Sequence, residues 1–222
     1  LSASLPASKS LLGFAGAPFT LYTYAVEGSH KGNLVQAKKG LVTGLFNGFW
    51  EKLFPELLEE LCVQAEGGAE AVCLFDTAAG ELTLSDYRNL ILPALRQLTA
   101  AFKDRHPEKK VIYYSKFTHL HYLHEIQDEN IDVLGIDWRM PLAKTLRELG
   151  DQYMIQGNLD PVHLHLPWNY LAAHWRELWG EVLESGVSPD RWICGLGHGV
   201  LPKTPEDNVR KSVELIHREF RY

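Results

Sequence analysis

The sequence predicts an α/β fold built on a parallel β-sheet, and three observations indicate it. Six short apolar runs alternate with longer segments that have helical spacing. Each run is continuously hydrophobic and is followed by glycine or polar residues, as expected for parallel strands buried on both faces. The 222 residues are 45% hydrophobic, which is enough for a sizeable core, so we expect residues 1–222 to form a single domain.

The expected strands cover residues 11–16, 71–76, 111–116, 133–137, 153–157 and 192–196. The clearest helix lies within residues 49–68, where apolar side chains share one stripe, glutamates lie opposite, and Gly67 and Gly68 can end the helix. Further helices are expected to begin at Ser85, Thr118, Pro141, Trp168 and Thr204. The last has a start signal, with Thr204 as the N-cap and Pro205 in the first turn.

Two sheet architectures fit this alternation. An open dinucleotide-binding sheet would carry G-x-G-x-x-G after its first strand, but the segment there reads GFAGAPFTL. A closed (β/α)8 barrel needs eight strand–helix units, and six are visible, which would leave two strand edges unpaired.

Composition narrows the class of protein. The net charge of -6, with lysine and arginine scattered along the chain, gives no footprint for nucleic acid or an anionic membrane. No apolar stretch approaches the roughly 20 residues that span a bilayer. Three separated cysteines, Cys62, Cys73 and Cys194, indicate buried thiols in a reducing cytoplasm.

In a parallel barrel the chemistry lies where the strands end. The predicted ends carry aromatic and hydrogen-bonding side chains: Phe14, Tyr24, Phe75, Asp76, Thr77, Ser115, Lys116, Asp137, Trp138, Arg139, Gln156, Asn158, Asp160 and His198. They contain no nucleophile–base pair, phosphate loop or paired-cysteine metal frame. The structural alternatives are a strand-closing role for His198, a half-buried aromatic at Tyr24, and a cap or turn at Thr77. No role is assigned to Asp76, Asp137, Asp160 or Lys116.

The segments GFAGAPFTLYTYAVEG, LFDTAAG, GIDW, IQGNLDP and GLGHGVLPKTPEDNV have the order and spacing of motifs in the uroporphyrinogen decarboxylase family. The chain resembles that family over essentially its whole length. The resemblance implies a (β/α)8 TIM barrel, of which this chain supplies about six βα units. It also implies a cytoplasmic, homodimeric enzyme of porphyrin and haem biosynthesis that uses no cofactor or metal.

The implied reaction converts the four acetate side chains of uroporphyrinogen III to methyl groups, giving coproporphyrinogen III. The substrate-binding residues that the resemblance implies are Tyr24, Thr77, His198, Phe14 and Phe75. Tyr24 and Thr77 match carboxylate-binding residues, His198 matches a histidine that meets a propionate, and the two phenylalanines match residues that line the cleft. Gly197 and Gly199, which flank the histidine, would let a bulky macrocycle approach the backbone.

The resemblance assigns no catalytic residue to this chain. In the family, the aspartate that binds the pyrrole N–H groups and the arginines that hold carboxylates lie in an N-terminal portion that precedes LSASLPASKSLLGFAG. We therefore expect these residues to be part of a longer enzyme and to be inactive alone.

Two other functions stay open. Cys194 with His198 suggests a zinc- or cobalamin-linked methyltransferase of the same superfamily, although the histidine-x-cysteine pattern of those enzymes is absent. The second alternative is a non-catalytic barrel remnant that binds a partner protein. Two histidine pairs favour solvated or capping roles over metal binding because they lie near predicted helix starts without carboxylate or cysteine partners: His119 with His121, and His163 with His165.

Overall fold

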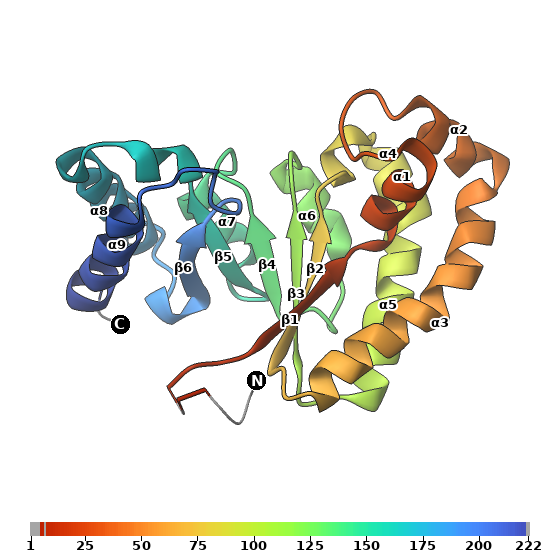
Figure 1. Ribbon diagram of the computed structural model, residues 1–222, viewed down its shortest axis with the longest axis horizontal. Coiled ribbons are helices and arrows are strands. Elements are labelled where there is room, and N and C mark those ends of the chain that lie inside the picture. The colour runs from red at the N-terminus through yellow and green to blue at the C-terminus, as the bar shows by residue number, and fades with distance from the viewer. Residues whose placement is uncertain (1–4, 7, 221–222) are drawn as a thin grey trace. The chain divides into compact units, whose positions relative to one another are not determined.

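The computed structural model describes residues 5–6 and 8–220, and residue contacts divide the chain after Leu134 into two compact units (Figure 1). Unit 1 contains β1 (Leu12–Gly16), α1 (Pro18–Glu27), α2 (Val35–Thr43), α3 (Leu45–Glu66), β2 (Ala71–Asp76), α4 (Leu84–Asp86), α5 (Leu92–Arg105), β3 (Lys110–Ser115) and α6 (Leu120–Ile126). The strand β4 (Val133–Ile136) contains the boundary. Unit 2 contains α7 (Leu142–Leu149), β5 (Met154–Leu159), α8 (Trp168–Glu184), β6 (Trp192–Leu196) and α9 (Glu206–Glu219).

The strands belong to a six-stranded parallel sheet whose order, β1-β2-β3-β4-β5-β6, repeats the order of the chain. A doubly wound dinucleotide-binding sheet reverses its strand order near the middle, so this order excludes that alternative. Sequential parallel strands joined by helices are what a (β/α) barrel requires. The predicted α/β fold is therefore confirmed.

In unit 1, the strands β1, β2 and β3 are covered by long amphipathic helices. The helix α3 packs against β1, β2 and α5, and Figure 1 shows α3 and α5 running side by side. The predicted apolar stripe is buried at Leu57, Leu61 and Ala65, and Trp50, which lies outside that stripe, is buried as well. The indole Nε1 of Trp50 donates to Gln97 Oε1 at 2.8 Å, which joins α3 to α5.

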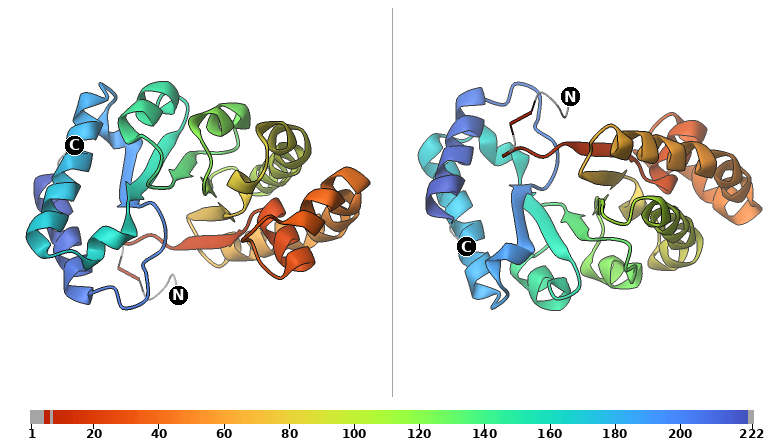
Figure 2. Two further views of the ribbon diagram at one scale, coloured as in Figure 1. Left: turned by 90° about the horizontal axis from the view of Figure 1, so that it is seen from above. Right: turned by 90° about the horizontal axis from the view of Figure 1, so that it is seen from below.

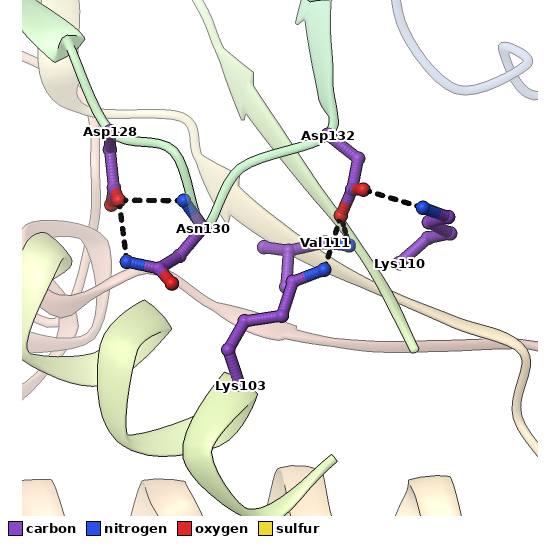
Figure 3. Close-up of polar contacts among 6 residues, drawn as sticks. All are labelled: Lys103, Lys110, Val111, Asp128, Asn130 and Asp132. Carbon is purple, nitrogen blue, oxygen red and sulfur yellow. Dashed lines mark hydrogen bonds and ion pairs between the residues drawn. The ribbon is translucent and has the colours of Figure 1, made fainter. Parts of the chain in front are cut away.

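A charged cluster ties α5 to the segments around β3 (Figure 3). The carboxylate of Asp132 accepts from Lys103 Nζ at 2.8 Å, from Lys110 Nζ at 2.8 Å and from the Val111 amide at 2.9 Å. Burial alone would raise the pKa of Asp132, but these three donors outweigh burial and the pKa is lowered. The cluster therefore links α5 and the start of β3 to the segment that precedes β4.

In unit 2, β5 pairs with β6, and α8 packs against both α7 and α9, as the two views in Figure 2 show. The core is rich in tryptophan. Trp192 is buried and donates its Nε1 to the carbonyl oxygen of Gly157 at 2.6 Å. Trp179 stacks on Phe220 with ring centroids 5.0 Å apart, and Trp175 Nε1 donates to Ser212 Oγ at 2.8 Å. Trp179 also stacks on Trp192 of β6, so these aromatic and polar contacts join α8 to α9 and to the sheet.

Two helices of unit 1, α1 and α2, were not among the predicted elements. The helix α1 carries a signal that the sequence contains, because Pro18 occupies its first turn and Gly28 ends it in the left-handed conformation with φ of 67°. The helix α2 begins after Leu34 with no side-chain cap, so it has no comparable start signal. Within the described part of the chain, no helix is both long enough and apolar enough to cross a membrane.

The prediction that Thr204 is the N-cap of the last helix is wrong. The helix α9 begins at Glu206, and Pro205 occupies the N-cap position without a side-chain cap. The hydroxyl of Thr204 instead donates to the carbonyl oxygen of Leu201 at 2.7 Å, so it closes the preceding turn and does not cap the helix. The expected helix starts at Ser85 and Thr118 are also displaced, to Leu84 and Leu120, because Thr83 caps α4 and the Thr118 hydroxyl contacts Ser115 Oγ at 2.7 Å.

Candidate functional site

Two aromatic rings project from adjacent strands on one face of unit 1. The register pairs Phe14 with Cys73 and Gly16 with Phe75, so the two phenylalanines lie on the same side of β1 and β2. Their ring centroids are 6.0 Å apart in an edge-to-face arrangement. Phe14 is 64% exposed and Phe75 is 38% exposed, which is unusual for phenylalanine within a sheet. The two rings therefore form an accessible apolar surface, as the predicted role in lining a cleft requires.

Tyr24 lies on α1 and is 47% exposed, so about half of its surface is accessible to a ligand. Its hydroxyl hydrogen-bonds His30 Nδ1, and the two rings lie 5.3 Å apart. When His30 Nδ1 carries a proton and donates, the Tyr24 hydroxyl hydrogen is available to a ligand carboxylate. His30 is thus a partner of the predicted site residue that the sequence analysis missed, and the six-residue separation across a helix end gave no signal for it.

Thr77 directly follows β2 and is half-buried in the turn before a 3-10 helix, Ala79–Glu81. The N-cap of that helix is Ala78, so Thr77 does not serve as its cap. The turn approaches β3 closely, because a Cβ at Gly80 would lie 2.4 Å from the backbone of Phe117. The tight turn leaves the Thr77 hydroxyl at the carboxyl end of the strand, where the resemblance places a carboxylate-binding group.

Asp76, one residue earlier, is fully buried and is not accessible to a ligand. Its carboxylate accepts from Thr20 Oγ1 at 2.9 Å and from the Tyr113 hydroxyl at 2.9 Å, and Tyr87 donates to Tyr113 at 3.1 Å. Burial raises the pKa of Asp76 to about 6, although these hydrogen bonds act to lower it. The network joins α1, β2 and β3, so Asp76 supports the segments that carry Tyr24 and Thr77.

In unit 2, His198 follows β6 and its ring meets the ring of Trp138 edge to face, with centroids 6.2 Å apart. The guanidinium of Arg139 lies over the same indole, 4.1 Å from the ring centroid. Arg139 also pairs with Asp137 Oδ2 at 3.2 Å, and its amide donates to Asp137 Oδ1 at 2.8 Å. An imidazole, an indole face and a guanidinium therefore lie close together at the carboxyl ends of β4 and β6.

The two glycines that flank His198 have different surroundings. A Cβ on Gly197 would lie 2.5 Å from the Trp138 amide nitrogen and 3.1 Å from the Asn158 carbonyl oxygen. A Cβ on Gly199 would meet nothing within 4 Å. The expectation that both glycines leave room for a ligand is therefore corrected for Gly197, whose missing side chain makes room for the protein's own backbone.

Asn158, at the end of β5, holds the turn after β4. Its Nδ2 donates to the carbonyl oxygen of Asp137 at 2.9 Å and to that of Met140 at 2.7 Å. Asp160 accepts from the Val162 amide at 2.9 Å and caps the 3-10 helix Pro161–His165. Asp137 and Asp160 thus each accept a hydrogen bond from the backbone amide two residues further on, as aspartates commonly do in turns.

Neither histidine pair gathers metal ligands. His119 precedes α6 as its N-cap, and His163 stacks on His174 with centroids 3.9 Å apart, beside a cavity of about 490 Å³. Within residues 5–6 and 8–220, no group of three or more histidine, cysteine, aspartate or glutamate side chains is placed to hold a metal ion. Cys62 and Cys73 are buried as predicted, whereas Cys194 is only partly buried, and desolvation raises the pKa of its thiol to about 12. The methyltransferase alternative is not favoured.

The fold and the strand ends define a class: a parallel (β/α) protein that presents aromatic, hydroxyl and imidazole groups where its strands end. A sequence model of the family described as uroporphyrinogen decarboxylase (URO-D) matches residues 1–219. The chain is 33% identical over 211 residues to a uroporphyrinogen decarboxylase of Chlorobium phaeobacteroides, covering 94% of this chain and 60% of the relative. It is 34% identical over 209 residues to that of Staphylococcus aureus strain JH9, covering 93% and 59%.

The chain belongs to the uroporphyrinogen decarboxylase family. It spans about 60% of the length of the curated relatives that it matches.

Proposed function

We propose that the protein carrying these residues decarboxylates the acetate side chains of uroporphyrinogen III to give coproporphyrinogen III. The observation that carries the proposal is the family match over residues 1–219, which includes each strand end that bears a predicted substrate-binding residue. Chemically suitable side chains at those ends support it. We further propose that the chain contributes to one (β/α)8 barrel domain of a cytoplasmic homodimer that works without a cofactor.

The proposed roles follow from the chemistry of each side chain. Phe14 and Phe75 offer an exposed apolar surface to the pyrrole rings of the macrocycle. Tyr24 and Thr77 donate hydroxyl hydrogens to substrate carboxylates. His198 donates an imidazole N–H to a propionate, and its ring contacts Trp138 edge to face.

These groups bind and orient the substrate. Loss of CO2 needs an electron sink, and a pyrrole ring protonated at carbon supplies one within the substrate, provided that a proton donor and a negative charge lie near the resulting cation. A hydrogen bond to a charged group contributes about 1.5–3 kcal/mol, whereas enzymatic rate acceleration needs about 8–23 kcal/mol. Tyr24, Thr77 and His198 therefore account for substrate recognition and not for the whole acceleration.

The test is an assay of the natural polypeptide that contains residues 1–222, with uroporphyrinogen III as substrate and coproporphyrinogen III and CO2 measured as products. We expect His198→Asn to raise KM with a smaller fall in kcat, because binding is lost more than chemistry. His217→Asn, an exposed histidine on α9, is the matched control and should leave both constants unchanged. Absence of coproporphyrinogen III from the unaltered protein would overturn the proposal. A selective collapse of kcat in His198→Asn would instead reassign this residue as an acid–base group.

A further inference from the structure

The buried side-chain amide of Asn158 forms hydrogen bonds through its nitrogen but not through its oxygen. The side chain is 4% exposed, and Nδ2 spends both of its hydrogens on the backbone carbonyl oxygens of Asp137 and Met140, at 2.9 and 2.7 Å. The Oδ1 atom is buried without a hydrogen-bond partner. An unpaired buried carbonyl oxygen destabilises a fold, so this position is not optimised for stability alone. What Asn158 supplies is the pair of donors.

The two hydrogen bonds from Asn158 Nδ2 hold both ends of the turn that carries Trp138. Asp137 and Met140 bracket Trp138 and Arg139 in the turn between β4 and α7, so the two bonds fix the turn's start and its end. The turn is also confined from the other side, because Gly197 lies so close to the Trp138 amide that even a methyl group would not fit. Trp138 is consequently held from β5 by Asn158 and from β6 by Gly197.

The indole of Trp138, held in this way, contacts the ring of His198. The ring of His198 meets Trp138 at 86° with centroids 6.2 Å apart, an arrangement in which the edge of one ring points at the face of the other. Besides this ring contact, the imidazole makes a weak hydrogen bond, in which Nδ1 lies 3.3 Å from the Gly199 carbonyl oxygen. The direction of the His198 ring therefore depends on where Trp138 lies.

We propose that Asn158 is a positioning residue for substrate recognition: it holds the turn after β4 so that Trp138 orients the imidazole of His198 toward the substrate. This inference rests on the proposed function for its kinetic consequence, but its structural part concerns only residues of unit 2. Asn158 does not touch the substrate. It acts through Trp138.

The experiment compares Asn158→Ala with Asn208→Ala in the natural polypeptide. Asn208 is a matched control because its Nδ2 also donates to two backbone carbonyl oxygens, those of Leu164 at 2.8 Å and Leu166 at 2.9 Å, away from the turn after β4. The first readout is the NMR signal of the His198 ring protons, assigned by its loss in His198→Asn and shifted by the ring current of Trp138. The second readout is KM and kcat for uroporphyrinogen III.

We expect Asn158→Ala to move the His198 ring signals toward their positions in Trp138→Leu, and to raise KM about tenfold while kcat changes less than about threefold. Asn208→Ala should leave the ring signals and KM at the unaltered values. Ring signals and KM unchanged in Asn158→Ala, or changed equally in Asn208→Ala, would overturn the inference.

If Asn158→Ala does not fold, Trp138→Leu tests the step on which the inference depends, the link between Trp138 and His198. It keeps the tether but removes the indole, so a KM equal to that of the unaltered protein would overturn the inference. The NMR readout uses no substrate. Should the unaltered protein not decarboxylate uroporphyrinogen III, the proposed function fails while the ring signals still show whether Asn158 positions His198.

Discussion

Replacing Gly197 with alanine tests the packing beneath His198 most directly. The added Cβ would lie 2.5 Å from the Trp138 amide nitrogen, 3.0 Å from the Asp137 carbonyl carbon and 3.1 Å from the Asn158 carbonyl oxygen. All three neighbours are backbone atoms, so no side-chain rotation can relieve the contact. The turn after β4 or the end of β6 must move by about 1 Å to restore ordinary contact, and overpacking of this kind costs about 1–3 kcal/mol.

Gly199→Ala is the control for this substitution. Nothing lies within 4 Å of a Cβ at Gly199, so alanine there should be neutral or should stabilise by about 0.4–1 kcal/mol, through the smaller entropy of the unfolded chain. Urea unfolding of both variants, with the slope m held in common, gives the difference in unfolding free energy. We expect Gly197→Ala to be the less stable by about 1–4 kcal/mol. Equal stability of the two variants would refute the reasoning, because the close approach would then impose no constraint.

Three further outcomes follow from the polar contacts. Asp132→Asn should lower the unfolding free energy, measured by urea titration, by about 1–3 kcal/mol at neutral pH. Because the pKa of Asp132 is lower in the folded than in the unfolded state, the difference between the variant and the unaltered protein should shrink as the pH falls below about 4. Tyr113→Phe removes a hydrogen-bond donor that partly offsets the effect of burial on the pKa of Asp76. Ionising the Asp76 carboxyl in the folded state therefore costs more free energy in the variant than in the unaltered protein. Its loss of stability should be larger near about pH 8 than near about pH 5, and the reverse order would contradict this. His30→Ala frees the hydroxyl of Tyr24 from its partner and should change KM for uroporphyrinogen III about two- to tenfold, while an unchanged KM would remove His30 from the site.

The strands were predictable because most of them are short, nearly continuous apolar runs; β5, with Gln156 and Asn158, is the most polar. The ranges 71–76 and 192–196 coincide with β2 and β6, and the other strands differ by one or two residues at their ends. The helix α1 was missed although Pro18 and Gly28 bracket it, since its side chains show no clear apolar stripe. The start of α9 was displaced because a threonine hydroxyl can close a turn as well as cap a helix, and only the fold decides between them.

The candidate site was predictable as a set of strand ends but not as a set of contacts. Phe14, Phe75 and Thr77 lie where parallel strands finish, which follows from strand assignment and register. The partners of the predicted residues come from elsewhere in the chain. His30 reaches Tyr24 across the end of a helix, and Trp138 reaches His198 from another strand, so neither pairing leaves a local pattern in the sequence.

The segment GLGHG illustrates why two identical residues need separate explanations. Gly197 is enclosed by the backbone of neighbouring strands, so its lack of a side chain serves the fold. Gly199 faces open space and is exposed, so its lack of a side chain leaves room beside the imidazole. The side of Gly197 is occupied by Trp138 and the end of β5, whereas the side of Gly199 is open. Under the proposed function, a substrate carboxylate would therefore meet the imidazole from the side of Gly199.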